Sequence, residues 1–457
     1  MDSVRAPAPF ESAFVTKFSD LGLIEPLQRA LAAKGYDMPT PIQAQSIPPL
    51  LEGRDLCGIA QTGTGKTAAF ALPSLHLLAE NLKHTPPQGC RMLVLSPTRE
   101  LASQIAESFV QYGKNLRLSV ATVFGGVPIN RQIRQLQRGV DILVATPGRL
   151  LDLIDQRALN LKFVEIFVLD EADQMLDLGF IHALKRIDQL LPKKRQSLFF
   201  SATMPKAIAE LGDRFLTNPV KVSVAPAATT AERIDQYATF CNPQEKQALL
   251  TMRIKAEPID RALVFTRTKH GADRVVRNLR AAGIAAEAIH GNKSQPQRER
   301  ALGLFRKGEV RILVATDIAA RGIDVGGVSH VFNFELPNVA EQYVHRIGRT
   351  ARAGAAGIAI AFVADDERPY LKAIEKLTRI KLEIEPLPEN FIAEKAKLPK
   401  PVAAPAAPAN SGDRGPRRRE GGSGERAGKP QPAKRRFSRP KGAPGAHRAA
   451  VKKFGSR

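Results

Sequence analysis

The chain has 457 residues, of which 43% are hydrophobic, and a formal net charge of +23. This length exceeds that of one ordinary domain, and no run reaches the roughly 18 apolar residues of a membrane span. The first residues lack the basic-then-apolar pattern of a secretory signal, and three scattered cysteines form neither a disulfide framework nor a zinc motif. The composition predicts a multidomain protein of the reducing cytoplasm and argues against a membrane protein, a secreted disulfide scaffold and a zinc module.

After a short flexible N-terminus at 1–17, short apolar runs alternate with helix-like stretches as far as about residue 385. Fully apolar strands between amphipathic helices are typical of α/β folds whose parallel sheets are covered on both faces. The runs expected to form strands are 92–96, 141–146, 163–170 and 196–203 in the first half, and 262–267, 285–291, 311–317, 330–337 and 358–364 in the second.

The sequence ILVAT occurs at 142–146 and again at 312–316, which indicates two copies of one α/β unit in tandem. We expect a first domain at 18–222, a connector at 223–235 and a second domain at 236–385. Because active sites of such sheets form at the carboxyl ends of the strands, the cleft between the two domains is the expected site.

Residues 60–67, between a short apolar run and a helix-like stretch, match a phosphate-binding loop except that Ala60 replaces the first Gly. Two glycines would let backbone N–H groups turn toward one anion at the positive end of a helix. Lys66 would reach the terminal phosphates, and Thr67 would hold Mg²⁺ by its hydroxyl. A Gly-rich turn without a ligand is the alternative. The residues expected to bind the nucleotide are Ala60, Gln61, Thr62, Gly63, Thr64, Gly65, Lys66 and Thr67.

The apolar run at 163–169 ends against three carboxylates, Asp170, Glu171 and Asp173. Like charges gathered at a strand end persist where a cation lies among them or where water reaches them freely. The magnesium ion of a nucleotide would be that cation, with Asp170 anchoring it through water and Glu171 orienting and deprotonating the attacking water. This interpretation predicts hydrolysis of the terminal phosphoryl group. A solvated surface turn is the alternative.

Together these motifs resemble a DEAD-box ATP-dependent RNA helicase, from about Phe18 to about residue 385. The segments 265–273, 289–295 and 313–324 are most similar to the bacterial RhlE-type branch. The resemblance implies an α/β fold of two tandem RecA-like domains, ATP and Mg²⁺ as cofactors, and RNA as the partner.

By this resemblance, residues 35–43 (GYDMPTPIQ) form an adenine-reading motif. Gln43, an amide with both a donor and an acceptor, would pair with the adenine edge. Tyr36 would stack on the base, and Phe18 would support it. Without the resemblance, the segment PTPIQ would be interpreted only as the start of a helix, where Pro is tolerated in the first turn.

The resemblance also links the SAT segment at 201–203 to the carboxylates. The hydroxyls of Ser201 and Thr203 would bond to Asp173, and this link would couple hydrolysis to RNA binding. Outside this family, Ser and Thr at such a place ordinarily satisfy local backbone groups.

In the second half, residues 345–354 (HRIGRTARAG) resemble the segment that carries the arginine fingers of the family. Arg349 and Arg352 would meet the terminal phosphate when the domains close, because planar guanidinium groups suit phosphate oxygens. His345 would lie in the network around the attacking water. A solvated basic turn is the alternative for Arg346.

Two further expectations follow from the same family pattern. Asp324 would bond to the ribose hydroxyl. Ala351 stands where the family usually has Gly, and we expect a helix or a turn with a negative φ there, which Ala adopts without strain.

The residues expected to face RNA are assigned by the resemblance as well. Several lie at expected helix starts, where N–H groups and hydroxyls bind phosphates, although each taken singly could be an ordinary helix cap. Such contacts read the backbone and the 2′-hydroxyl, not base identity. They are Thr98, Arg99, Gly125, Gly126, Thr146, Arg149, Arg267, Gln295, Arg298 and Thr316.

Residues 401–457 hold 15 Lys or Arg against 3 Asp or Glu, together with 9 Gly and 8 Pro. We predict a disordered basic tail over 386–457 that binds polyanions, RNA foremost. A solubilising tail or a site for a protein partner is the alternative.

The whole pattern predicts RNA-stimulated ATP hydrolysis that locally unwinds short duplexes or remodels RNA–protein complexes. ATP and RNA would close the two domains together, and this coupling must be reciprocal. The alternatives are a DNA helicase on the same fold, an RNA clamp or annealing scaffold, and a small-molecule ATPase. Ribosomal precursors and the RNA-decay machinery are both compatible partners.

Overall fold

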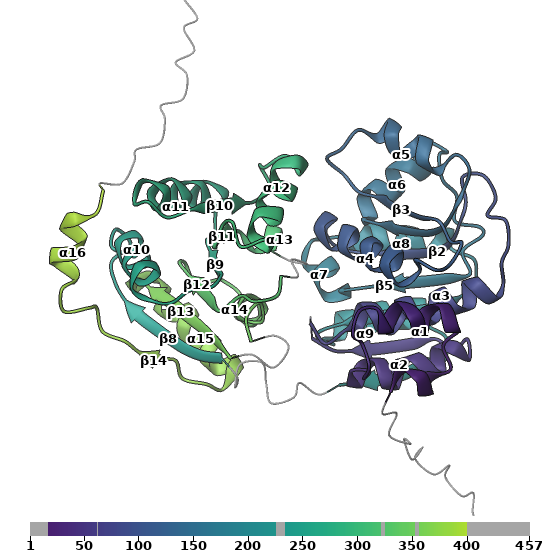
Figure 1. The fold of residues 1–457 in the computed structure, drawn as a ribbon, viewed down its shortest axis with the longest axis horizontal. Coiled ribbons are helices and arrows are strands. Elements are labelled where there is room, and N and C mark those ends of the chain that lie inside the picture. Colours follow the sequence, from purple (N-terminus) through teal and green to yellow (C-terminus); the bar gives the residue numbers. More distant parts are fainter. Residues whose placement is uncertain (1–16, 62, 225–233, 321–324, 352–355, 400–457) are drawn as a thin grey trace, which may run out of the picture. The chain divides into compact units, whose positions relative to one another are not determined.

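The computed structural model describes residues 17–61, 63–224, 234–320, 325–351 and 356–399 (Figure 1). These residues form two lobes, each built on one parallel sheet of seven strands. Among the helices in these ranges, none has the length and hydrophobicity of a membrane span.

The first lobe contains a sheet with the strand order β3-β4-β2-β5-β6-β1-β7, and all its neighbouring strands are parallel. Every connection between neighbours must therefore cross over the sheet, which places helices on its faces. The strands are β1 (Leu56–Ile59), β2 (Cys90–Leu95), β3 (Val120–Val123), β4 (Val140–Ala145), β5 (Ile166–Leu169), β6 (Gln196–Ser201) and β7 (Val220–Ser223).

The second lobe repeats this topology. Its order is β10-β11-β9-β12-β13-β8-β14, which becomes the order of the first sheet when seven is subtracted from each number. The two ILVAT segments fall on β4 and β11, which are corresponding strands, so the predicted tandem repeat is confirmed. The strands are β8 (Ile234–Phe240), β9 (Ala262–Phe265), β10 (Ala286–Ile289), β11 (Ile312–Ala315), β12 (His330–Asn333), β13 (Gly357–Val363) and β14 (Glu383–Ile384).

Alternate residues of each central strand enter different hydrophobic cores. In β2, Met92 and Val94 pack in one cluster, whereas Leu93 and Leu95 pack in another. Successive side chains of a strand point to opposite faces, so both faces of the sheet are buried. The predicted architecture of parallel sheets with flanking helices, as in tandem RecA-like domains, is confirmed (Figure 1).

The helices lie between the strands in chain order (Figure 1). The first lobe contains η1 (Phe18–Leu21), α1 (Glu25–Ala32), α2 (Pro41–Leu51), α3 (Lys66–Glu80), α4 (Arg99–Tyr112), α5 (Ile129–Leu136), α6 (Pro147–Asp155), α7 (Ala172–Asp177), α8 (Ile181–Leu190) and α9 (Lys206–Phe215). The second lobe contains α10 (Lys246–Ala256), α11 (Lys269–Ala281), α12 (Gln295–Arg306), α13 (Asp317–Ala320), α14 (Ala340–Ile347), η3 (Asp365–Glu367), α15 (Arg368–Thr378) and α16 (Phe391–Lys397).

The folded part of the chain extends beyond residue 385, so the predicted start of the tail at 386 is wrong. Phe391, the first residue of α16, is 3% exposed and packs in a core of the second lobe. Lys395 forms an ion pair with Glu245 just before α10, with an N–O distance of 3.2 Å. One buried aromatic ring anchors this short helix, and such an anchor leaves no periodic pattern in a polar sequence. The predicted tail from residue 400 onward lies outside the described residues.

Candidate nucleotide and RNA sites

Three motifs of the first lobe meet where adjacent strands end. β5 pairs with β6, and β6 pairs with β1. The phosphate-loop residues follow β1, the carboxylates follow β5, and Ser201 is the last residue of β6. The carboxyl ends of parallel strands lie at one edge of a sheet, so the structure brings the motifs together as predicted.

The loop after β1 has the backbone that an anion site needs. Gly63 and Gly65 have φ values of 86° and 93°, and α3 begins directly afterwards at Lys66. The side chain of Lys66 is buried, and its ammonium donates to the carbonyl of Ala60 over 2.9 Å. A triphosphate would compete with this carbonyl for the ammonium. Thr62 lies outside the described residues.

Gln43 connects the proposed adenine motif to this loop. Its Oε1 accepts the N–H of Thr40 over 2.9 Å, and its Nε2 donates to the carbonyl of Gly65 over 3.1 Å. A Cβ at Gly65 would lie 2.4 Å from Nε2, and the φ of 93° strains any residue with a side chain, so this position favours Gly. An amide has two N–H groups and two lone pairs, so these bonds leave capacity for a base edge.

The two aromatic residues assigned to adenine differ in exposure. Phe18 is 4% exposed and packs in the core, as a supporting residue would. Tyr36 is 43% exposed, and the ammonium of Lys34 lies 5.7 Å from its ring centroid. The exposed ring is the one that can stack on a base.

The carboxylates of Asp170 and Glu171 are both buried. Oδ1 of Asp170 and Oε2 of Glu171 have no hydrogen-bond partner among the described residues. Burial raises the pKa of Glu171 to about 7, although the nearby Lys66 ammonium acts in the opposite direction. Burial likewise raises the pKa of Asp170.

These unpaired oxygens fit a hydrated cation. No cluster of three or more His, Cys, Asp or Glu side chains that could hold a metal exists within the described residues. Magnesium in nucleotide sites takes one or two carboxylates and completes its shell with water and phosphate oxygens. Asp170 and Thr67, the predicted ligands, are of the required chemistry.

The backbone at Glu171 is strained. Its φ and ψ of 56° and 51° lie in the left-handed region, and it is the residue before α7. A non-Gly residue in this conformation costs about 1–2 kcal/mol, and such strain concentrates at functional positions. Because of this turn, the Glu171 side chain points in another direction than it would if β5 continued through this residue.

Asp173 contacts the SAT segment as predicted, but through Thr203. Its Oδ2 accepts the hydroxyl of Thr203 over 3.1 Å and the N–H groups of Ala202 and Thr203 over 3.1 and 3.0 Å. The hydroxyl of Ser201 is buried and has no partner among the described residues. The predicted bond from Ser201 is therefore not present.

The RNA-facing residues predicted in the first lobe lie at the ends of β2, β3 and β4. Thr98 caps α4 by accepting the N–H of Leu101 over 3.3 Å, so the helix-cap interpretation also holds for it. Gly126 has a φ of 78°, and a Cβ there would lie 1.9 Å from the Arg99 guanidinium. Burial lowers the pKa of Arg99. Gly125 lies beside this contact, and Thr146 occupies the position before α6.

Arg149 belongs to the same group and is fixed by two acceptors. It donates to the carbonyl of Val127 over 3.1 Å and to Oε1 of Gln132 over 3.0 Å. Both acceptors follow β3, so the guanidinium is held beside the two glycines. A preorganised guanidinium loses little entropy when it binds a phosphate.

The RNA-facing residues predicted in the second lobe also lie at strand ends and helix starts. Gln295 is the first residue of α12, which contains Arg298, and Ser294 before it forms a capping box with Gln297. The carbonyl of Thr316 accepts the N–H groups of Ala319 and Ala320 over 3.0 and 2.9 Å, at the start of α13. Arg267 follows β9.

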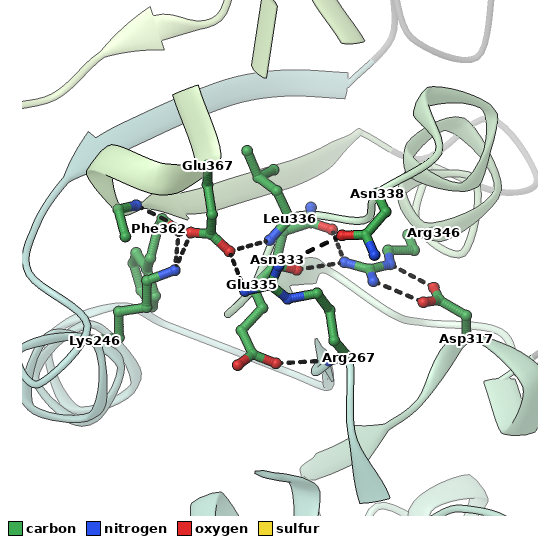
Figure 2. A network of polar contacts seen from close by, with 11 residues as sticks. Lys246, Arg267, Asp317, Asn333, Glu335, Leu336, Asn338, Arg346, Phe362 and Glu367 are labelled. Carbon is green, nitrogen blue, oxygen red and sulfur yellow. Dashed lines mark hydrogen bonds and ion pairs between the residues drawn. The ribbon is translucent and has the colours of Figure 1, made fainter. Parts of the chain in front are cut away.

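Arg346 is 1% exposed, so the interpretation of this residue as part of a solvated basic turn is wrong. It forms a bidentate contact with Asp317, with N–O distances of 2.6 and 2.8 Å, and donates to Oδ1 of Asn333 over 3.0 Å (Figure 2). A planar guanidinium paired with a carboxylate in this way has a fixed orientation. Arg346 thereby joins α14 to α13.

The finger segment is described only in part. Nε of Arg349 donates to the carbonyl of His345 over 3.1 Å, one helical turn back. Ala351 has a φ of 53°, so the expected negative φ is wrong, and the local backbone is strained where the family usually has Gly. Arg352 and Asp324 lie outside the described residues.

Sequence reasoning gave no role to Lys246 and Glu367, which form a buried ion pair in the second lobe. They are far apart in the chain and belong to no motif. Only a comparison of the two halves, strand by strand, could have drawn attention to Lys246.

Comparisons with known proteins agree with this geometry. The DEAD/DEAH box helicase family matches residues 40–211, and the helicase conserved C-terminal domain matches residues 244–354. The ATP-dependent RNA helicase CshA of Limosilactobacillus reuteri is 44% identical over 80% of this chain and 73% of that protein. The DEAD-box ATP-dependent RNA helicase CshA of Bacillus cereus is 44% identical over 81% of this chain and 69% of that protein.

A solved structure extends the similarity to the fold. S. cerevisiae Dbp5 bound to RNA and ADP BeF3 is 32% identical, with a TM-score of 0.73 over 83% of this chain and 98% of that chain. The residues matched by the first family model include the phosphate loop and the carboxylate motif. The chain belongs to the DEAD-box family of ATP-dependent RNA helicases.

Proposed function

We propose that this protein hydrolyses ATP in response to RNA, and that hydrolysis drives local unwinding of short RNA duplexes or remodelling of RNA–protein complexes. ATP-dependent RNA helicase activity is the activity of the family to which the chain belongs. The observation that carries the proposal is the junction of β1, β5 and β6, where the phosphate loop, the carboxylates and the SAT segment meet.

Bound ATP and Mg²⁺ would be held by residues of the first lobe. The glycines of the loop direct N–H groups at the phosphates, Lys66 moves from the Ala60 carbonyl to the terminal phosphates, and Gln43 meets the adenine edge. Thr67 and Asp170 would hold the magnesium ion, which neutralises charge on the phosphate oxygens.

Glu171 orients the attacking water and accepts its proton. Without nucleotide and cation, burial raises the pKa of this carboxyl to about 7, so it holds a proton more readily than an exposed Glu does. The left-handed backbone at Glu171 and the Asp173–Thr203 contact set the position of the carboxylate relative to β6. The same contact transmits RNA binding to the hydrolytic residues.

The second lobe supplies charge that acts when the two lobes close on ATP. Arg349 and Arg352 would meet the terminal phosphate, Asp324 the ribose, and His345 the network around water. Because closure also binds RNA, the two ligands favour the same state, and each must raise the affinity of the other. RNA binds through its backbone and 2′-hydroxyls, largely without regard to sequence.

The finer assignments rest on sequence similarity alone. We infer a bacterial RhlE-type helicase from residues 265–273, 289–295 and 313–324, while the curated relatives described above carry the name CshA. We further propose a cytoplasmic location, ribosomal precursors or the RNA-decay machinery as partners, and RNA binding by the basic segment from residue 400 onward.

ATPase and unwinding assays on the full chain test the proposal. RNA should stimulate ATP turnover strongly and DNA of equal length only weakly, while Glu171→Gln should abolish both turnover and unwinding. Equal stimulation by DNA would indicate a DNA helicase. Full unwinding or annealing by the Glu171→Gln variant would indicate an RNA clamp whose ATP cycle is dispensable.

A further inference from the structure

Lys246 and Glu367 form a buried ion pair in the second lobe (Figure 2). Their side chains are 4% and 1% exposed. The ammonium of Lys246 also donates to the carbonyl of Phe362 over 2.8 Å. The carboxylate of Glu367 accepts the N–H groups of Leu336 and Ala364 over 3.1 and 3.0 Å. Glu367 therefore joins the segments that follow β12 and β13 to the start of α10.

Lys246 occupies the position in the second lobe that corresponds to Lys66 in the first. Each lysine is the first residue of the helix that follows its strand, α10 after β8 and α3 after β1, and these are corresponding strands. The backbone gives the same alignment. The first residue after β1 donates to the last residue of β6 over 3.0 Å, and the first residue after β8 donates to the last residue of β13 over 3.1 Å.

The two lysines differ in the anion beside them. Lys66 follows a glycine-rich loop that can receive a phosphate, whereas Lys246 contacts a carboxylate of its own lobe. A buried ammonium without a partner is strongly destabilising. Glu367 thus places a carboxylate of the protein where a nucleotide would place a phosphate at the corresponding position in the first lobe.

The same carboxylate contacts Arg267, one of the residues expected to bind RNA. Oε1 of Glu367 lies 3.3 Å from Nη2 of Arg267, and Nη1 of Arg267 donates to Oδ1 of Asn338 over 3.4 Å (Figure 2). The backbone N–H of Arg267 donates to Oε2 of Glu335 over 2.7 Å. A guanidinium has five N–H donors, so one bound at two corners can still donate to a phosphate oxygen.

We propose that Glu367 is a positioning residue for RNA binding, a built-in anion that corresponds to a nucleotide phosphate and fixes the Arg267 guanidinium toward the RNA backbone. This rests on the proposed function and on the RNA-binding role that the family resemblance assigns to Arg267. Lys246 contacts the other carboxylate oxygen, Oε2, and Asn338 fixes the second corner of the guanidinium. Arg267 then binds a phosphate without first losing the freedom of a long exposed side chain.

The test compares variants of the full chain in RNA-stimulated ATPase assays with oligo(U). Glu367→Gln should raise the RNA concentration for half-maximal ATPase about tenfold and change kcat less than about twofold, because the change removes the preorganisation of Arg267 and leaves the nucleotide residues of the first lobe unaltered. Lys246→Met leaves the carboxylate beside Arg267, so it should lower the melting temperature without the shift in RNA concentration. Glu385→Gln, which breaks the partly buried contact with Arg253, is the matched control.

A double variant separates positioning from general stability. If Glu367 acts through Arg267, adding Glu367→Gln to Arg267→Ala should cause no further rise in half-saturating RNA. A further rise would overturn the proposal, and so would an unchanged or lower value for Glu367→Gln alone, or an equal shift for Lys246→Met. Should Glu367→Gln fail to fold, the Lys246→Met/Glu367→Gln pair, which leaves no buried charge, replaces it.

The outcomes also distinguish this proposal from the helicase function. If Arg267→Ala leaves half-saturating RNA unchanged, Arg267 does not bind RNA and the proposal fails. RNA stimulation of the unmodified protein would still support the proposed function in that case. Absence of RNA stimulation in the unmodified protein would overturn both.

Discussion

The hydroxyl of Thr203 donates a hydrogen bond to Oδ2 of Asp173 over 3.1 Å, and its backbone N–H donates to the same oxygen over 3.0 Å. The end of β6 is thereby tied to the carboxylate motif after β5. Thr203→Val removes the hydroxyl and keeps the N–H contact. We expect unwinding to fall about tenfold and ATP turnover less than about threefold, the effect of removing roughly one charge-assisted hydrogen bond.

Unwinding and ATPase rates measured on one preparation check this prediction. Thr217→Val, at an exposed residue of the same lobe, is the control and should change neither rate. Equal loss of both activities in Thr203→Val would mean that the contact serves catalysis and not its coupling to RNA.

Lys66→Ala should abolish nucleotide binding. The ammonium of Lys66 is buried and donates to the Ala60 carbonyl, so it is placed to exchange that carbonyl for a phosphate. Titration with a fluorescent ATP analogue measures the effect. Lys206→Ala, at a side chain that is 92% exposed, should bind as the unmodified protein does. Tight binding by Lys66→Ala would contradict the phosphate-loop assignment.

The pKa of Glu171 gives the nucleotide-free protein a pH-dependent stability. Its value rises from 4.5 to about 7 because of burial, so the native state holds this proton more tightly than the unfolded chain does. The stability that the protonated carboxyl confers is complete below pH 4.5 and is lost as the pH rises through about 7.

Melting temperatures of the unmodified protein and Glu171→Gln, measured from about pH 5 to about pH 8, test whether stability falls as the pH rises. The difference between them should shift in favour of the variant as the pH rises, because the amide does not titrate. Added ATP and Mg²⁺ should reduce that shift, since a nearby cation favours the charged carboxylate. Parallel curves without ligand would show that burial of Glu171 has no such consequence.

Ala351→Gly should stabilise the second lobe. Ala351 has a φ of 53°, and relief of the left-handed strain is worth about 1 kcal/mol. Urea unfolding monitored on the second lobe measures the change. Ala373→Gly, at an exposed position inside α15, should destabilise by about 1 kcal/mol and serves as the control. Loss of stability in Ala351→Gly would show that the strain is not real.

Two truncations separate the basic segment from α16. A chain that ends at Pro399 should bind RNA more weakly, and its salt dependence should fall by about 0.7 in log–log slope for each phosphate that the protein no longer neutralises. A chain that ends at Glu385 should in addition lose stability, because Phe391 no longer fills its place in the core. Filter binding of RNA across a salt series and thermal melts measure the two effects. An unchanged salt slope in the longer truncated chain would show that the basic segment does not bind RNA.

The sequence predicted the elements that depend on local pattern. The apolar runs form parallel strands, and the two ILVAT segments lie on the corresponding strands β4 and β11. Both could be predicted because the hydrophobic pattern of a buried strand depends only on residues that are neighbours in the sequence. The junction of the phosphate loop and the carboxylates was equally predictable, since strand ends gather at one edge of such a sheet.

Other features depend on residues that are distant in the chain or on backbone conformation. Nothing in the sequence shows that Arg346 pairs with Asp317, because that contact exists only once α13 and α14 pack together. The positive φ values at Glu171 and Ala351 are set by the surrounding fold and not by the residues, which disfavour them. Helix α16 is anchored by one buried ring, that of Phe391. One apolar residue creates no periodic hydrophobic pattern, so the sequence does not predict this helix.

The docking of α16 sets the C-terminal limit at which the second lobe can be cut without disturbing its core. Phe391 is buried in a core of the second lobe, and Lys395 pairs with Glu245. Helix α16 is therefore part of that lobe's structure. A domain boundary drawn before α16 would uncover apolar surface, and such exposed surface favours association between molecules.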